Sequence, residues 1–191
     1  RGAAAHIHQL EGAKLHNSKI VLCHIVQKGQ QGRTDIAAEP HGFSLGLQMM
    51  TGMPGSTKDD DVLTAARFAA LKPDTMRIYP TLVLKNTLLA KWFEDGEYVP
   101  QTVEEAAAEC AELLDVFELY KVNVIRLGLH AEESLEENLL AGPYHPAFRE
   151  ICESLRFRKK IAPMLTRLPK GSYVLKVAPS EVSKCSGQKR S

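Results

Sequence analysis

The chain has 191 residues, of which 44% are hydrophobic and 25% charged, values typical of a globular protein with one or at most two domains. No apolar run reaches the roughly 18 residues of a membrane-spanning helix, so we expect no membrane span. The first residues, RGAAAHIHQL, lack a charged segment followed by an apolar stretch, so we expect no secretory signal.

The cysteines are scattered and lie at least 33 residues apart. They are Cys23, Cys110, Cys152 and Cys185. This spacing matches neither a zinc knuckle nor a disulfide framework, so we expect a reduced, cytoplasmic protein.

The N-terminal part holds a loose group of histidines. They are His6, His8, His16 and His24. A metal site usually needs a further ligand of defined geometry, so we expect surface or partly buried histidines and no resident metal. A small metal-binding protein is kept as a third hypothesis.

The net charge of +1 is unevenly distributed. Residues 91–141 contain 13 acidic and 3 basic residues, whereas residues 149–191 contain 11 basic and 3 acidic residues. Such asymmetry is typical of a basic surface for an anionic partner. The alternative is that an acidic helical face packs against the basic segment within one molecule, and the charge count does not separate the two.

The first predicted elements are two strands and a helix. Lys19–Val26 has the composition of a strand, and Ser44–Met50 is a mostly apolar run that ends at a glycine- and proline-rich turn. Ser56 and Thr57 then offer N-caps to a helix with apolar residues at spacings of 3 and 4. This helix should end near Leu71, since a proline follows two residues later.

Two more strands follow in alternation with helices. We expect a strand at Thr75–Tyr79, a loop or strand end at Pro80–Asn86 and a short helix at Thr87–Asp95. The pattern then predicts the longest helix, over Val103–Tyr120, and directly afterwards a strand at Asn123–Gly128. Thr102 and Glu105 form a capping box at the start of the long helix.

The C-terminal elements are less regular. Helices are predicted at Ala131–Leu140 and Pro146–Arg156, and one more strand at Ser172–Val177. The alternation of strands and helices favours an α/β fold with parallel pairing, because each crossover must carry a helix. A half barrel is the economical interpretation and an open doubly wound sheet is its rival. In both, the loops after the strand ends carry function.

Two segments suggest a ligand site. The turn at Thr51–Gly55 has two glycines and precedes a helix N-terminus, which permits close approach of an anionic ligand. The turn dihedrals alone would also explain the glycines. Arg77 and Tyr79 alternate with apolar residues on one strand, and a pair pointing into a barrel would suggest a site, since burying it is costly. An arginine at the barrel end, paired with an acid, is the alternative.

The basic residues form small patches near the C-terminus. They are Arg156, Arg158, Lys159, Lys160, Lys184, Lys189 and Arg190. Such runs are usually solvated faces, but they are also the residues with which an RNA-binding module would contact phosphates.

These segments together resemble a known family. Gly46–Thr57 (GLQMMTGMPGST) and Arg77–Asn86 (RIYPTLVLKN) are similar to the radical-SAM domain of the Elongator catalytic subunit, and closer still to stand-alone bacterial proteins with that domain. Ile125–Gly128 (IRLG) and Leu140–Pro146 (LAGPYHP) support the resemblance, which covers about residues 41–191. It implies the C-terminal half of a partial (β/α) barrel of radical-SAM type, with parallel strands and outer helices.

The resemblance also implies a cofactor and a chemistry. In the family, a [4Fe–4S] cluster binds S-adenosylmethionine, whose reductive cleavage gives a 5′-deoxyadenosyl radical, in Elongator on a tRNA substrate. By analogy the cofactor-binding residues would be Gln48, Met49, Gly52, Pro54, Arg77, Tyr79, Pro80, Thr81 and Leu82. No catalytic residue is assigned.

The sequence departs from the family in three places. The cluster motif C-x-x-x-C-x-x-C is absent, and none of the four cysteines replaces it by spacing. Residues 1–40 match poorly, and the sequence ends within the family's basic motif with no acetyltransferase domain after it. We therefore expect a fragment or a degenerate member of the family. Its segments would be a poorly matching 1–40, a half barrel over 41–145 and a basic extension over 146–191.

Two further expectations follow. The alternative function is a non-catalytic RNA- or tRNA-binding module that uses the basic C-terminal residues. A half barrel exposes sheet edges, so association with the other half of the barrel or with a second copy is expected.

Overall fold

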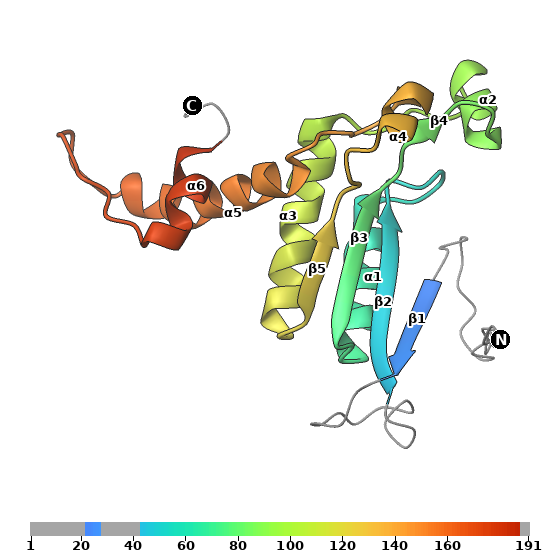
Figure 1. Cartoon of the computed structure of the whole chain (residues 1–191). Helices are drawn as coiled ribbons and strands as arrows, with labels where there is room; N and C mark the ends of the chain where they lie inside the picture. The colour runs from blue at the N-terminus through green and yellow to red at the C-terminus, as the bar shows by residue number, and fades with distance from the viewer. Residues whose placement is uncertain (1–21, 28–42, 188–191) are drawn as a thin grey trace.

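The computed structural model describes residues 22–27 and 43–187 (Figure 1). The histidines at 6, 8 and 16 and the basic pair at 189–190 lie outside the described residues. None of the helices in the described part is long and apolar enough to cross a membrane.

The centre of the molecule is a four-stranded sheet in the order β1-β2-β3-β5. Its strands are β1 (Leu22–Gln27), β2 (Phe43–Thr51), β3 (Thr75–Pro80) and β5 (Asn123–Leu127). Strands β2, β3 and β5 are parallel, as predicted, whereas β1 pairs antiparallel with β2. The described strands form an open sheet, and its closure into a barrel stays a prediction.

Helices α1 (Lys58–Ala70) and α3 (Val103–Leu119) lie on one face of this sheet, behind it in Figure 1. Both helices start as predicted, and each has a capping box. The hydroxyls of Thr57 and Thr102 accept hydrogen bonds from the amides of Asp60 and Glu105, respectively. In return, the amides of Thr57 and Thr102 donate to the carboxylates of Asp60 and Glu105. The core lies between these helices and the sheet. Its largest fully buried side chains include Met49, Met76, Ile78, Leu113 and Phe117.

The opposite face of the sheet has no helix over it in Figure 1. Alternation along the strands separates the two faces: Met76 and Ile78 are buried in the core, and Arg77 and Tyr79 point the other way and are half-buried. The sheet therefore has one face packed against helices and one face that carries polar and aromatic side chains.

A second, two-stranded sheet lies beyond the carboxyl ends of the parallel strands (Figure 1). It pairs β4 with β6, and helices α2 and α4 flank it. Their bounds are β4 (Val83–Leu84), β6 (Leu139–Ala141), α2 (Leu88–Glu94) and α4 (Glu133–Asn138). The helix predicted over Ala131–Leu140 is thus too long, because its last residues pair with β4 instead.

The C-terminal part is built on α5 (Phe148–Leu165), which packs against α3 and then extends away from the sheet (Figure 1). At 18 residues α5 exceeds the 17 of α3, so the prediction that α3 is the longest helix is wrong. The predicted end of α5 at Arg156 is also too early. The helix continues past Pro163, which lies in its last turn and lacks the backbone donor that other residues would have there.

The strand predicted over Ser172–Val177 does not form among the described residues. The segment is exposed and has no ladder partner there, and a strand exists only through its pairing. It leads to a 3-10 turn (Pro179–Glu181) and to α6 (Val182–Ser186), which packs on α5.

Candidate functional site

A cleft of about 510 Å³ lies on the open face of the sheet, at the carboxyl ends of the parallel strands. Gln48 and Met50 of β2, Tyr79 of β3 and Arg126 of β5 form its floor. The remaining lining comes from the end of β3 and from the segments that follow β3 and β5, including β4 and α4, namely Pro80, Leu82, Leu84, Leu129, His130, Glu132 and Leu135. This first cleft combines apolar walls with a few polar groups, the composition typical of a small-molecule site.

Two arginines meet on the open face. Arg77 of β3 is the register partner of Arg126 on β5, next to a local irregularity of the pairing. Both side chains are half-buried, and no hydrogen bond or ion pair joins either of them to another described residue. Like charges that face each other across two strands destabilise a sheet, so an anion between or beside them would be stabilising.

The predicted cofactor residues divide into two groups. Four of them line the first cleft: Gln48, Tyr79, Pro80 and Leu82. Arg77 lies on the same face of the sheet through its alternation with the buried residues of β3.

The other predicted cofactor residues do not line the first cleft, and their positions have structural reasons. Met49 is 1% exposed and its side chain lies in the core, on the helix side of the sheet. Thr81 is buried, and its amide and hydroxyl both donate to the carbonyl of Thr51, at 2.9 and 2.7 Å. Pro54 lies in the turn after β2 and Gly52 is held by hydrogen bonds, and neither lines the cleft.

Sequence analysis missed several lining residues, above all Met50, Arg126, His130 and Glu132. Arg126 lies in the segment Ile125–Gly128 (IRLG), which supported the family resemblance but contained no predicted site residue. The rule that parallel strand ends meet at one edge would have found Arg126 and His130, because both lie at or after the carboxyl end of β5.

A buried polar network fixes the turn at Gly52. The Gly52 amide donates to Asp61 Oδ2 at 3.1 Å, and the Tyr98 hydroxyl donates to the Gly52 carbonyl at 2.7 Å. The φ angle of Gly52 is +66°, and a Cβ at this position would lie 2.6 Å from Gln101 Oε1. Glycine is therefore required here for backbone and packing reasons, independently of a ligand.

Two carboxyl groups are buried together beneath this turn. Asp61 is 1% exposed and Glu109 is 3% exposed, and the Gln101 amide donates to Glu109 Oε2 at 2.7 Å. Burial, followed by a hydrogen bond shared with Asp61, raises the pKa of Glu109 from 4.5 to about 7. Below this pKa, Glu109 holds a proton, so that Asp61 and Glu109 do not place two negative charges together in the core.

Two of the described cysteines, Cys110 and Cys152, are core thiols. Cys110 and Cys152 are fully buried, and burial raises the pKa of Cys110 well above its usual value and that of Cys152 to about 12. Cys185 is half-buried on α6. Among the described residues, no group of three or more histidine, cysteine or acidic side chains could hold a metal ion.

Arg156 is a correction to the predicted RNA-binding set. Its side chain is 10% exposed, and its guanidinium reaches Asp115 at 2.8 Å and Glu153 at 3.1 Å and also pairs with Glu118. The charge of Arg156 lowers the pKa of Glu118. Arg156 is therefore the centre of a structural ion-pair cluster and is not exposed to a partner.

Two neighbouring lysines extend this contact between α5 and α3. Lys159 lies 3.8 Å from Glu112, and Lys160 lies 3.4 Å from Glu118, although both lysines are mostly exposed. The acidic face of α3 thus packs against the basic part of α5. This is the intramolecular alternative that the charge distribution had left open.

Comparison with known families identifies the part of the chain that contains most of the first cleft. Residues 73–156 match the model of the Radical_SAM C-terminal domain. This part of the chain is similar to a radical-SAM C-terminal domain. The match starts just before β3 and ends at Arg156 in α5, so it includes Tyr79 and Arg126 of the cleft floor, while the residues from β2 precede it.

Relatives in the curated proteins share part of this sequence. The chain is 33% identical over 66 residues to a tRNA uridine(34) acetyltransferase of Dehalococcoides mccartyi, a stretch covering 31% of this chain and 14% of that protein. It is 37% identical over 68 residues to the tRNA uridine(34) acetyltransferase of Methanocaldococcus jannaschii, covering 34% and 13%. A third, from Methanocaldococcus infernus, is 30% identical over 102 residues, covering 48% and 18%. The chain thus matches less than a fifth of the length of each of these relatives.

Proposed function

We propose that the first cleft binds S-adenosylmethionine, and that the chain supplies this part of the cofactor site to a radical-SAM protein that modifies tRNA. The observation that carries the proposal is the arginine pair Arg77–Arg126, half-buried on the open face without a carboxylate partner in the described part of the chain. The carboxylate of the cofactor would offset the repulsion between the two guanidinium groups.

The walls of the cleft support the same ligand. Met50, Leu82 and Leu129 provide apolar surface for the adenine ring, and Gln48 and Tyr79 provide hydrogen-bonding groups beside it. Tyr79, Leu82 and Leu129 lie within residues 73–156, the part that matches the Radical_SAM C-terminal domain, and this supports the proposal. The tRNA substrate is inferred from the names of the relatives, which are tRNA uridine(34) acetyltransferases.

The residues of this chain do not fit an iron–sulfur cluster. Three thiolates on one short loop would be needed, whereas Cys110 and Cys152 are buried in the core as thiols and Cys185 lies on a separate helix. We therefore assign no radical step to the chain itself. Reconstitution with iron and sulfide, followed by reduction in the presence of S-adenosylmethionine, should give no 5′-deoxyadenosine.

Mapping of the ligand by NMR tests the proposed position. In ¹⁵N-labelled protein, S-adenosylmethionine should shift the amide resonances of Gln48, Tyr79 and Arg126. The amides of Glu104 and Glu118, on the far side of α3, should remain in place. Shifts spread over the whole chain, or confined to α3 and α5, would contradict a site on the open face.

The second candidate function is RNA binding through the basic C-terminal residues, and fewer of these residues are available for it than the sequence suggested. Arg156 is committed to the ion-pair cluster, whereas Arg158, Lys159 and Lys160 are exposed along α5 and Lys184 is half-buried on α6.

A further inference from the structure

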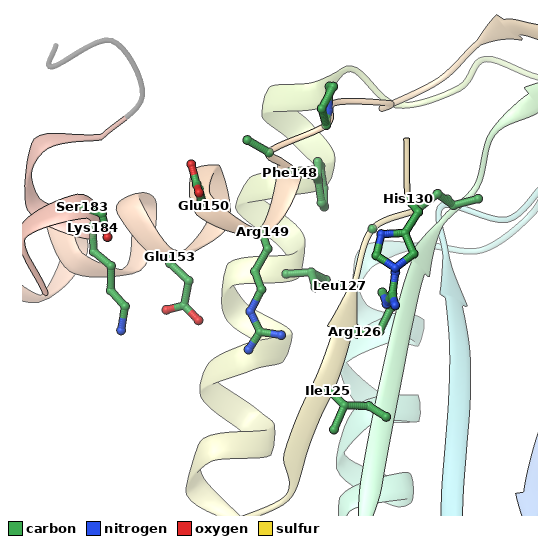
Figure 2. A pocket seen from close by; sticks show the side chains of 14 residues that line it. Ile125, Arg126, Leu127, His130, Phe148, Arg149, Glu150, Glu153, Ser183 and Lys184 are labelled. Atoms are coloured by element: carbon green, nitrogen blue, oxygen red, sulfur yellow. The ribbon is translucent and has the colours of Figure 1, made fainter. Parts of the chain in front are cut away.

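A second cleft, of about 590 Å³, lies on the other side of the end of β5, between this strand and helices α5 and α6 (Figure 2). Its walls include Ile125 and Leu127 of β5, Phe148 of α5 and Ser183 of α6. Arg126, Leu129 and His130 line both clefts. The two clefts are therefore adjacent, and a ligand in the second cleft would lie beside the first.

Two cationic side chains of the second cleft are held in position. Arg149 Nη1 donates to the carbonyl of Val124 at the edge of β5, at 2.8 Å. Lys184 Nζ lies 2.9 Å from Glu181 Oε1. Figure 2 shows that the side chains of Arg149 and Lys184 extend from α5 and α6 toward the same side of the cleft. Arg126 adds a third positive charge where the two clefts meet.

Two carboxylates also line this cleft, Glu150 and Glu153. Glu153 lies between Arg149 and Lys184 in Figure 2, and its Oε2 accepts from Arg156 Nη1 at 3.1 Å. Glu153 therefore shares the Arg156 guanidinium with Asp115 and Glu118. The three cations Arg126, Arg149 and Lys184 outnumber these two carboxylates, so the lining residues carry a formal charge of +1 with His130 neutral.

We infer that the second cleft binds a phosphate of an RNA chain, next to the nucleotide that would reach the first cleft. The inference rests on the proposed function for its choice of RNA as the substrate. A guanidinium and an ammonium group held apart on two helices match a phosphodiester, which accepts from both. The apolar side chains beside them, including Ile125 at 42% exposed, provide surface for the adjoining sugar or base.

Binding of a fluorescein-labelled, unmodified tRNA transcript, followed by anisotropy at several salt concentrations, tests this inference. Lys184→Gln and Arg149→Gln remove cations of the cleft, and Glu150→Gln removes a carboxylate. Arg167→Gln and Lys170→Gln remove cations of the same basic segment outside both clefts, and Glu104→Gln is the matching carboxylate control on α3.

Lys184→Gln and Arg149→Gln should each weaken binding by roughly 3- to 10-fold and lower the salt dependence by about one phosphate contact. Glu150→Gln should strengthen binding, while the three control variants should change it by less than about 2-fold. Lys184 is half-buried on α6 and lies outside the core, so its variant should stay folded and tests the inference even if Arg149→Gln unfolds.

Equal losses for cleft and control cations, unchanged binding by Lys184→Gln, or no binding by the wild-type chain would overturn the inference. Titration of the same proteins with S-adenosylmethionine separates the two proposals. If the cofactor binds and the RNA pattern is absent, only the phosphate site is wrong. If the RNA pattern is present and the cofactor does not bind, only the proposed cofactor site is wrong.

Discussion

Arg77 and Arg126 face each other across the parallel strands β3 and β5, and no carboxylate pairs with either in the described part of the chain. A sheet gains nothing from two facing guanidinium groups, because like charges in register repel each other. Their position on this face, within the residues that match the Radical_SAM C-terminal domain, supports the proposal that a ligand carboxylate lies beside them.

Arg126→Gln should therefore stabilise the ligand-free protein. Removal of one charge relieves the repulsion, which is worth about 0.2–1 kcal/mol in the free energy of unfolding. Urea unfolding monitored by circular dichroism measures the change. Arg67→Gln on the exposed side of α1 is the control and should give no gain, since Arg67 lies in the last turn, where a positive charge is favourable. A destabilised Arg126→Gln protein would show that this side chain has a structural role instead.

Stability should fall as the pH rises from 4.5 to 7. The pKa of Glu109 is raised to about 7 in the folded protein by burial and by the hydrogen bond with Asp61, so the folded state holds a proton that the unfolded state releases at its ordinary pKa of 4.5. The contribution is complete below pH 4.5 and is lost as the pH rises through 7, with a slope of at most about 1.4 kcal/mol per pH unit.

Glu109→Gln isolates this contribution. The amide keeps the position neutral at all pH values and can still accept from Gln101, so the variant should be more stable than the wild type at pH 8 and should lose this part of the pH dependence. Denaturant titrations at pH 5, 6, 7 and 8 measure both effects. Glu104→Gln, on the exposed surface of the same helix, serves as the control. Parallel pH profiles for wild type and Glu109→Gln would contradict the assignment.

Gly52→Ala should be strongly destabilising, by about 2–4 kcal/mol. The new Cβ would lie 2.6 Å from Gln101 Oε1, in addition to the strain of a positive φ angle. Gly55→Ala is a matched control, because Gly55 also has a positive φ, +73°, but no atom within 4 Å of the added Cβ. Its cost should be about 1 kcal/mol. Equal losses of thermal stability in the two variants would show that Gln101 yields without penalty.

Arg156→Ala should cost about 1–3 kcal/mol, since it leaves Asp115, Glu118 and Glu153 without their shared cation between α3 and α5. Lys160→Ala, which removes an exposed partner of the same Glu118, should cost no more than about 0.5 kcal/mol. Urea titrations of both variants measure the difference. A small effect of Arg156→Ala would mean that apolar packing alone holds the two helices together.

Local signals in the sequence predicted the central part of the fold well. The caps at Thr57 and Thr102, the positions of β2, β3 and β5 and the parallel pairing all follow from short-range patterns, and the structure confirms them. Features that depend on a distant partner were not predicted. The β4–β6 pair and the absence of a strand at Ser172–Val177 depend on pairing between distant segments. Alternation within one segment does not predict which other segment it pairs with.

The candidate site shows the same division. Strand alternation correctly placed Arg77 and Tyr79 together on one face, and the resemblance pointed to the ends of β2 and β3. Arg126 and His130 were missed because they become part of the cleft only when β5 lies beside β3. Arg156 was assigned to a basic surface because a run of positive charges in sequence gives no information on which of them is buried.

Isothermal titration of the chain with S-adenosylmethionine tests the central claim most directly, with wild type, Arg126→Gln and Arg67→Gln compared under the same conditions. The proposal predicts saturable one-to-one binding by the wild type and by Arg67→Gln, and at least a 10-fold loss of affinity in Arg126→Gln, as expected for a charge-assisted contact worth about 1.4 kcal/mol or more. Absence of binding by a folded wild-type chain, or equal affinities of all three proteins, would contradict the assignment of the first cleft to this cofactor.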